Sequence, residues 1–316
     1  MFFNLEQMQA CAFGALRVWK EDGCFYFARM TQALEDAFGA VRPGFNKNAR
    51  STTDCRLDFH TDSLNLRLDA ASESSACKIE VYVDGVPALY EEFEGRRVVF
   101  LELPEGEKRI TIALPCHSVG RIYNLSVDEH ASIKPHRFDH KLLFLGDSIT
   151  QGWKTTHDSM SFAGKVARWF NAESLNWAVG GSWFDPTFVE KTEFDPEAVI
   201  IAYGTNDYSA RKDITQFTEY CRAYLQRVKA LYGDKKVFVL TPIWRADHTL
   251  CKGTGTLLDC SEVISREAEA CGFTVLDGFK LFPHSREYMA DGYLHPNDLG
   301  FAVYADNLIK ALTPYI

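Results

Sequence analysis

The sequence predicts an all-β sandwich over residues 1–135, followed by a three-layer α/β domain over residues 136–316. Two patterns support this division. The first part alternates apolar and polar residues in period two, which is typical of half-buried antiparallel strands. The second part alternates short apolar runs with amphipathic segments, which predicts parallel strands covered by helices. The polar segment 128–140 contains Pro135 and is expected to join the two parts.

Five alternating runs predict the strands of the sandwich: residues 56–60, 64–68, 78–83, 98–103 and 109–114. Turn sequences such as Asp84-Gly85 and Pro104-Glu105-Gly106 lie between them. Short strands at this spacing predict an antiparallel, jelly-roll-like sandwich. Within this part only residues 31–38 are expected to be helical.

Apolar runs in the second part predict buried parallel strands at residues 142–145, 198–202, 237–240 and, as a less apolar fourth, 273–276. Helical periodicity is clearest at residues 160–171, 213–232, 258–271 and 298–312. Ligands of open α/β sheets bind outside the carboxyl ends of the strands. The loops that follow these strands are therefore where a site is expected.

Composition argues against several functions. The formal net charge is −9, and no basic stripe is available to bind nucleic acid or an anionic membrane surface. No signal peptide and no apolar run of 18 residues is visible, so a cytoplasmic protein is expected. Nine dispersed cysteines without a CxxC pair indicate reduced thiols, and no metal or cofactor is expected.

The strongest local signal is residues 144–152, where a predicted strand ends and a helix should begin. Ser148 would stand among backbone N–H groups that suit the stabilisation of an oxyanion, although Asp147 and Ser148 could instead cap the helix. Asn206, in Gly204-Thr205-Asn206-Asp207, could donate to the same oxyanion or belong to a simple turn.

The third segment, residues 291–298, precedes the last predicted helix and carries Asp291 and His295 on one loop. A carboxylate and an imidazole placed together suit a general base and the group that orients it. The alternative is a loop in which Asn297 or Asp298 caps the helix, and both descriptions can hold at once.

These segments in this order resemble the SGNH hydrolases, also called the GDSL esterase family, whose catalytic domain is flavodoxin-like. The matching blocks are Gly146-Asp147-Ser148, Asn176-Trp177-Ala178-Val179-Gly180-Gly181, Gly204-Thr205-Asn206-Asp207 and the block that contains His295. The resemblance implies that Ser148 is the nucleophile and His295 the base. It also implies an oxyanion hole formed by the Ser148 N–H, Asn206 and the Gly181 N–H, with Gly180 as the alternative. The G-x-S-x-G elbow of the other large serine-esterase fold is absent.

The last block departs from the family in one respect. The acidic residue usually stands three positions before the histidine, where this chain has Gly292. Asp291 lies four positions before His295 and would reach the imidazole if the loop bulges. Otherwise a backbone carbonyl would orient His295 and leave a Ser–His dyad. We favour Asp291.

Four aromatic residues on loops near the expected site, Trp153, Trp183, Trp244 and Tyr293, are candidates for the substrate pocket. They could equally pack between domains. The other histidines are interpreted as structural or solvated: His60, His117, His130, His136, His140, His157, His248 and His284. His136 and His140, with Asp139 between them, could mimic a metal site, but nothing nearby completes one.

A sandwich followed by an SGNH domain resembles certain carbohydrate esterases that remove acetyl groups. The resemblance implies a serine esterase acting on short acyl esters of sugars, with an oligosaccharide or small-molecule ester as its partner. One alternative is a lipase-like or thioesterase-like acylhydrolase with a longer acyl pocket. Another is a sugar-binding protein whose α/β part is inactive. Fold alone does not decide between them.

Overall fold

The computed structural model describes residues 1–73 and 77–316, which fall into two compact units. We name them the sandwich unit (residues 1–31, 50–138 and 157–159) and the α/β unit (residues 32–49, 139–156 and 160–316). Residues 32–49, which lie inside the range 1–135 expected for the sandwich, pack with the α/β unit. The division into a sandwich domain at residues 1–135 and a catalytic domain at residues 136–316 stays a prediction.

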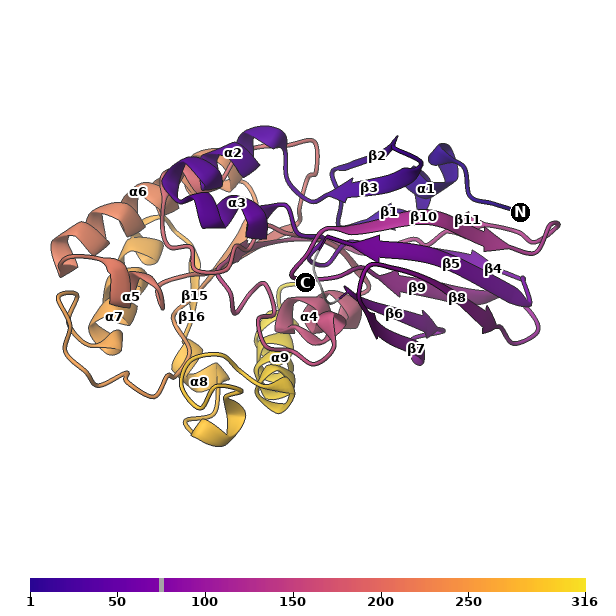
Figure 1. Cartoon of the computed structure of the whole chain (residues 1–316). Helices are drawn as coiled ribbons and strands as arrows, with labels where there is room; N and C mark the ends of the chain where they lie inside the picture. The colour runs from indigo at the N-terminus through magenta and orange to yellow at the C-terminus, as the bar shows by residue number, and fades with distance from the viewer. Residues whose placement is uncertain (74–76) are drawn as a thin grey trace. The chain divides into compact units, whose positions relative to one another are not determined.

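The sandwich unit consists of two antiparallel sheets, which confirms the predicted β-sandwich (Figure 1). One sheet has the order β1-β4-β9-β6-β7, with β11 also paired to β4, and the other β2-β3-β10-β5-β8. Apolar side chains of both sheets, among them Phe59, Leu68, Ile112 and Ile122, form one core. The strands are β1 (Ala12–Phe13), β2 (Arg17–Glu21), β3 (Cys24–Ala28), β4 (Arg56–Thr61), β5 (Asn65–Ser72), β6 (Cys77–Val83), β7 (Val86–Phe93), β8 (Arg96–Glu102), β9 (Lys108–Ala113), β10 (Gly120–Val127) and β11 (Lys134–Pro135).

All five predicted strands occur in this unit, as β4, β5, β6, β8 and β9, but other elements were not predicted. The expectation of helix at residues 31–38 alone was wrong, because three helices form: α1 (Leu5–Cys11), α2 (Gln32–Val41) and α3 (Pro43–Ala49). A capping box begins α1, in which Asn4 and Gln7 each accept the other's backbone N–H. The joining segment is also shorter than residues 128–140, because β11 pairs with β4 and β12 begins at His140.

The α/β unit contains a parallel sheet in the order β13-β12-β14-β15-β16, which confirms the flavodoxin-like arrangement. Its strands are β12 (His140–Gly146), β13 (Ala172–Asn176), β14 (Ala198–Ala202), β15 (Lys236–Leu240) and β16 (Thr274–Leu276). Its helices beyond α2 and α3 are α4 (Phe162–Trp169), α5 (Asp207–Ala210), α6 (Ile214–Tyr232), α7 (Leu257–Ala270), α8 (Gly278–Leu281) and α9 (Asp298–Leu312). Strand β13 was not predicted because its sequence, AESLN, contains no apolar run.

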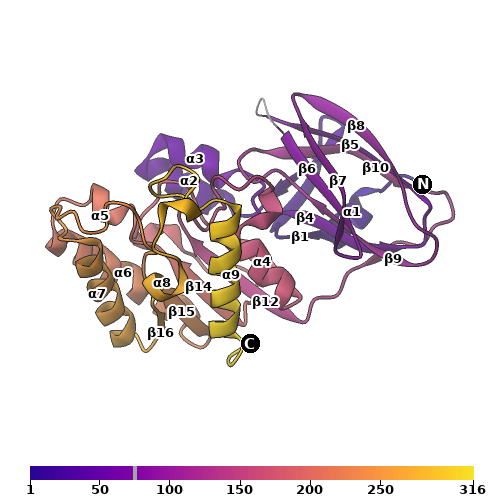
Figure 2. The same ribbon diagram turned by 90° about the horizontal axis from the view of Figure 1, so that it is seen from below.

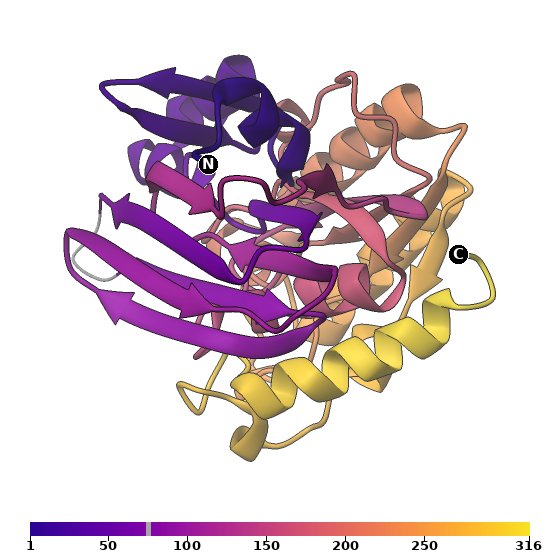
Figure 3. The same ribbon diagram turned by 90° about the vertical axis from the view of Figure 1, so that its right-hand side faces the viewer.

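The strands of this sheet are buried on both faces. Alternate side chains point to opposite faces, so Leu142 and Phe144 of β12 pack on one face with α4 and α9. Leu143 and Leu145 point to the other face and are fully buried. Figure 2 shows α4 and α9 on one side of the strands and α6 and α7 on the other. Figure 3 shows α9, in yellow, as a straight helix close to the C-terminus.

The order of the strands determines where a site can form. β12 and β14 are adjacent and in register, with Gly146 opposite Ala202 at their carboxyl ends. The chain leaves β12 toward β13 on one side and later returns to β14 on the other, so the direction of winding reverses here. Such a switch point is where ligands bind in open α/β sheets.

Within residues 1–73 and 77–316, no helix combines the length and the apolar character that are needed to span a bilayer.

Candidate functional site

Ser148 lies two residues beyond the carboxyl end of β12 and is 6% exposed. Gly146 makes the turn before it possible, because a Cβ at this position would lie 2.2 Å from Thr150 Oγ1 and 2.8 Å from the carbonyl oxygen of Ala202. The Ser148 Oγ atom is 3.0 Å from His295 Nε2. A hydroxyl and an imidazole at this distance can exchange a proton.

His295 lies on the loop before α9 and is oriented by Asp291. Its Nδ1 atom is 2.8 Å from Asp291 Oδ2, while Oδ1 of the same carboxylate accepts the backbone N–H groups of Tyr293 (2.9 Å), Leu294 (2.7 Å) and His295 (3.1 Å). Gly292 has a φ of +66° and allows the chain to fold back over the carboxylate. The structure therefore brings Ser148, His295 and Asp291 together despite the extra residue in this loop.

The two ionisable groups of this loop have shifted pKa values. Partial burial would raise the pKa of Asp291, but hydrogen bonds from Leu294, the His295 side chain and other backbone N–H groups lower it to about 2. Burial lowers the pKa of His295 below its ordinary value, and the Asp291 carboxylate opposes this shift. At neutral pH the pair is therefore a carboxylate beside a neutral imidazole, the state that a general base requires.

Two glycines after β13 were candidates for a backbone oxyanion donor. The Gly180 N–H donates to Gln151 Oε1 at 2.7 Å and is thus engaged. Gly181 has a φ of +84°, and its N–H, like that of Ser148, donates no hydrogen bond within the described chain. A Cβ added to Gly180 would lie 3.8 Å from Ser148 Cβ, so this loop passes directly beside the serine. The geometry favours Gly181 over Gly180.

Asn206 follows β14 and precedes α5. One hydrogen of its Nδ2 group is donated to the Ser182 carbonyl oxygen at 2.8 Å, and its side chain does not cap α5. An amide carries two N–H donors, so the second remains for a ligand. The bond to Ser182 also joins the loop after β14 to the loop that contains Gly181.

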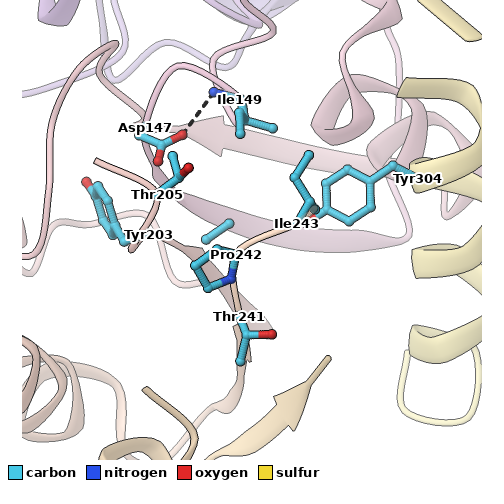
Figure 4. Close-up of a pocket in the computed structure, with 9 residues that line it drawn as sticks. Asp147, Ile149, Tyr203, Thr205, Thr241, Pro242, Ile243 and Tyr304 are labelled. Atoms are coloured by element: carbon cyan, nitrogen blue, oxygen red, sulfur yellow. Dashed lines mark hydrogen bonds between the residues drawn. The ribbon is translucent and has the colours of Figure 1, made fainter. Parts of the chain in front are cut away.

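Two buried carboxyl groups flank these loops. Asp147 accepts the Ile149 N–H at 2.9 Å, and burial raises its pKa to about 7. Burial also raises the pKa of Asp207 to about 6, although Arg211 opposes the shift. Figure 4 shows Asp147 beside Thr205 at a cavity of about 20 Å³, which is the space of about one water molecule. Both carboxyl groups accept backbone N–H groups, Asp147 from Ile149 and Asp207 from Phe184.

A buried arginine connects the site loops. Arg245, in the loop after β15, is 3% exposed, and its Nη1 donates to the Thr205 carbonyl oxygen at 2.8 Å. Its Nε donates to Asp247 at 2.6 Å, and Nη2 donates to the Tyr293 hydroxyl at 3.0 Å. Burial acts to raise the pKa of Asp247, but bonds from Lys252, Tyr293 and Arg245 lower it to about 2. This group joins the loop of Asn206 to the loop of His295.

The four aromatic candidates for the substrate pocket differ in their surroundings. Trp183 is half-buried and meets the Phe45 ring edge-on, at 5.2 Å between centroids. Trp153 is half-buried, and its backbone N–H donates to the Ser148 carbonyl oxygen. Tyr293 is 42% exposed, with its hydroxyl bound to Asp247. Trp244 is 9% exposed and packs in the core of the α/β unit, so its role as a pocket residue stays a prediction.

Four residues of the site were not predicted from the sequence: Arg245, Asp247, Gln151 and Asn48. Arg245 follows a predicted strand at the edge where the site was expected, and its position there was a usable signal. Nothing in the local pattern marks Asn48, which contacts the loop of Gly180 from a segment 132 residues earlier. In the described part of the chain, no three His, Cys, Asp or Glu side chains are grouped to hold a metal ion.

Comparisons with known proteins agree with this fold. Residues 144–303 match the GDSL-like Lipase/Acylhydrolase family. A comparison with curated proteins found no match. Among solved structures, the chain is similar to the Salicylyl-Acyltransferase SsfX3 from a tetracycline biosynthetic pathway, with a TM-score of 0.80 and 18% identity over 96% of this chain and 95% of that one.

Two carbohydrate esterases share the fold as well. A family two carbohydrate esterase from Clostridium thermocellum, in complex with cellohexaose, has a TM-score of 0.66 and 18% identity over 84% of this chain and 93% of that one. A family two carbohydrate esterase from Cellvibrio japonicus has a TM-score of 0.70 and 15% identity over 96% of this chain and 94% of that one.

Proposed function

This chain belongs to the GDSL-like lipase/acylhydrolase family, and from that premise we propose that it is a serine esterase that removes short acyl groups, acetyl above all, from carbohydrates. The observation that carries the proposal is a continuous series of hydrogen bonds between three side chains. Ser148 Oγ is 3.0 Å from His295 Nε2, and His295 Nδ1 is 2.8 Å from Asp291 Oδ2. This is the geometry of a nucleophile, its base and the group that orients the base.

The reaction starts with proton transfer. Neutral His295 takes the hydroxyl proton of Ser148 at Nε2 as Oγ attacks the ester carbonyl. Asp291 accepts the Nδ1–H, keeps the imidazole in the productive tautomer and stabilises the imidazolium that forms. His295 then returns the proton to the departing alcohol. Water then attacks the acyl-enzyme while His295 takes its proton, and His295 passes that proton to Ser148 Oγ as the bond between Oγ and the acyl carbon breaks and the acid leaves.

The negative charge that develops on the carbonyl oxygen needs donors. The Ser148 N–H, the Gly181 N–H and the second Nδ2 hydrogen of Asn206 supply them. Two observations support these assignments. The N–H groups of Ser148 and Gly181 donate no other hydrogen bond within the described residues, and a hydrogen bond to the Ser182 carbonyl oxygen fixes the Asn206 amide. One such donor typically contributes 10²–10³ to kcat, or about 2.7–4 kcal/mol.

The substrate class rests on similarity and on the aromatic surroundings. Two solved structures with this fold are carbohydrate esterases, one of them in complex with cellohexaose. Trp183 lies two residues beyond Gly181 and is half-buried, so part of its surface can contact a ligand. Aromatic rings on loops commonly contact sugars or line acyl pockets. An oligosaccharide or small-molecule acetyl ester is therefore the proposed substrate.

The same acyl-enzyme could serve other reactions. A longer acyl pocket would make the protein lipase-like or thioesterase-like. One similar structure is named an acyltransferase, and transfer differs from hydrolysis only in which nucleophile attacks the acyl-enzyme. Each alternative predicts a product that can be measured.

The test compares wild type with Ser148→Ala and with the control Ser265→Ala, whose hydroxyl is bound within α7. We expect wild type and the control to hydrolyse p-nitrophenyl acetate faster than the butyrate and to leave the octanoate nearly untouched. Ser148→Ala should be inactive. Wild type and Ser265→Ala should also release acetate from acetylated xylo-oligosaccharides, and Ser148→Ala should not. A fluorophosphonate probe should label wild type on Ser148.

The outcomes separate the possibilities. Full activity in Ser148→Ala contradicts the proposal. Preference for octanoate favours the long-chain alternative. Consumption of ester that yields an acylated alcohol in place of free acetate, when glycerol or a sugar is added, favours acyl transfer. Binding of oligosaccharides by all variants without any turnover favours the inactive sugar-binding alternative.

A further inference from the structure

The helical segment 32–49 reaches the candidate site from the N-terminal part of the sequence. Both of its helices belong to the α/β unit. Phe45 of α3 is 2% exposed, and its ring meets Trp183 edge-on at 5.2 Å and Phe188 at 6.2 Å. These contacts fix α3 against the loop that follows β13, the loop that contains Gly180 and Gly181.

One polar contact links α3 to this loop. Asn48, in the last turn of α3, donates from Nδ2 to the Gly180 carbonyl oxygen at 3.2 Å. The approach is close, because a Cβ added to Gly180 would lie 3.1 Å from Asn48 Nδ2. Glycine at position 180 is what leaves room for this amide.

The bonded carbonyl is part of a particular peptide unit. The Gly180 C=O and the Gly181 N–H belong to one planar amide, so a bond that fixes the carbonyl also fixes the direction of the N–H. A donor on the carbonyl oxygen polarises the amide and strengthens the N–H at its other end. The amide that Asn48 holds is thus the one that carries the N–H proposed as an oxyanion donor.

A second side chain holds the preceding peptide. Gln151 Oε1 accepts the Gly180 N–H at 2.7 Å, and Gln151 Nε2 is 3.4 Å from the Asn48 carbonyl oxygen. Asn48 and Gln151 therefore hold the N–H and the C=O of Gly180 from two elements that are distant in sequence. Of the two N–H groups of Gly180 and Gly181, the one of Gly181 donates no hydrogen bond within the described residues.

We infer that Asn48 is a positioning residue that aims the Gly181 N–H at the oxyanion through its hydrogen bond to the Gly180 carbonyl. The inference rests on the proposed ester hydrolysis. Because the bond of Asn48 is to the Gly180 peptide, its effect should appear in transition-state stabilisation and leave the general base unchanged.

The test replaces Asn48 by alanine and by leucine, which keeps the side-chain volume without the donor. Asn46→Ala is the matched control, because Asn46 lies two residues earlier on α3 and donates to the Glu35 carbonyl oxygen at 3.2 Å, away from the Gly180 loop. The loss of one half-buried hydrogen bond lowers the free energy of unfolding by too little to unfold a chain of this size. Thermal unfolding and circular dichroism of all variants verify this.

We expect kcat on p-nitrophenyl acetate to fall about tenfold in both Asn48 variants, a part of the effect of losing a whole oxyanion donor. KM should stay within about twofold, since the ground-state ester carries little charge on its carbonyl oxygen. The affinity of phenylboronic acid, whose tetrahedral adduct places a charged oxygen in the same hole, should fall by the same factor as kcat. The acid limb of the pH profile should not move.

If both Asn48 variants keep the kcat and the boronate affinity of wild type, the inference is overturned. The proposed esterase function is not affected by that result. An equal loss in Asn46→Ala also overturns it, because the effect would then come from packing of α3. A rise in KM without a fall in kcat shows that Asn48 binds substrate instead. Turnover that does not depend on Ser148 overturns the proposed function and this inference together.

Discussion

Asp291 Oδ2 lies 2.8 Å from His295 Nδ1 although the residues are four positions apart in the sequence. The three backbone N–H groups that Oδ1 accepts hold the intervening residues in a tight loop around the carboxylate. The extra residue is thus accommodated as a turn over Asp291. The carboxylate orients the imidazole directly, without a backbone carbonyl in its place.

The first prediction concerns Asp291→Asn. The asparagine oxygen can still accept the backbone N–H groups, but its NH₂ group would face Nδ1 and favour the wrong imidazole tautomer. We expect kcat for p-nitrophenyl acetate to fall about 10²–10⁴-fold. Asp306→Asn, an exposed acid paired with Lys310 on α9, is the control. Retention of most activity in Asp291→Asn would instead support a Ser–His dyad.

The pH profile provides the second prediction. His295 acts as a base only when neutral, and burial lowers its pKa below 6.5. The acid limb of kcat/KM for wild type should therefore have its midpoint below pH 6.5. Removing the carboxylate in Asp291→Asn removes the interaction that raises the pKa of His295, so the midpoint should move to lower pH. A midpoint above pH 7 in wild type would contradict the burial of the imidazole.

The third prediction concerns Arg245→Met. It leaves the Thr205 carbonyl oxygen without its buried donor, while Asp247 keeps its bonds from Lys252 and Tyr293, so the free energy of unfolding should fall by about 1–3 kcal/mol. Arg222→Met is the matched control, because that arginine is half-exposed in its pair with Glu267 and should contribute about 0–1 kcal/mol. Urea unfolding measures both variants. Equal losses would show that Arg245 behaves as a surface residue.

The fourth prediction separates two tryptophans. Trp244→Ala empties a core position and should lower the free energy of unfolding by about 3–5 kcal/mol. Trp183→Ala should lower the free energy of unfolding less. It should lower kcat/KM more for acetylated oligosaccharides than for p-nitrophenyl acetate, because the half-buried Trp183 stands two residues after Gly181. Urea unfolding and steady-state kinetics test the pair. An equal loss on both substrates would remove Trp183 from the proposed sugar contact.

The local sequence pattern predicted the elements around Ser148 well because sheet geometry brings the carboxyl ends of neighbouring strands together. The apolar runs of β12 and β14 are unambiguous, and Ser148 and Asn206 follow them directly. Strand β13 lacks such a run, and β7 is largely exposed, so neither carries the period that marks a buried strand. Weak patterns of this kind are resolved only by tertiary pairing.

Local sequence patterns could not predict contacts between segments that are distant in the sequence. Asn48 meets Gly180 across 132 positions, and Arg245 meets Tyr293 across 48. The positions of α2 and α3 depend on packing, with Phe38 stacked on Phe188 at 4.0 Å. A period of 3.6 indicates that such a helix exists but not which surface it covers.

The last prediction concerns Asp147 and the pH dependence of stability. Burial raises the pKa of Asp147 from 3.8 to about 7 in the folded protein. Between these two pH values the Asp147 carboxyl is protonated in the folded chain and ionised in the unfolded chain. The protonated carboxyl therefore contributes fully to the free energy of unfolding below pH 3.8, and this contribution is lost as the pH rises toward 7. Asp147→Asn cannot ionise and lacks this loss.

Urea unfolding of wild type and Asp147→Asn at pH 5, 6.5 and 8 tests this pH dependence. The free energy of unfolding of Asp147→Asn, relative to wild type, should rise from pH 5 to pH 7 by at most about 1.4 kcal/mol per pH unit and level off above. Asp195→Asn is the control, because Lys235 lowers the pKa of that exposed carboxyl, so the difference between this variant and wild type should be constant from pH 5 to pH 8 and disappear only in more acidic solution. A difference for Asp147→Asn that stays constant from pH 5 to 8 would mean that this carboxyl group ionises as freely in the folded chain as in water.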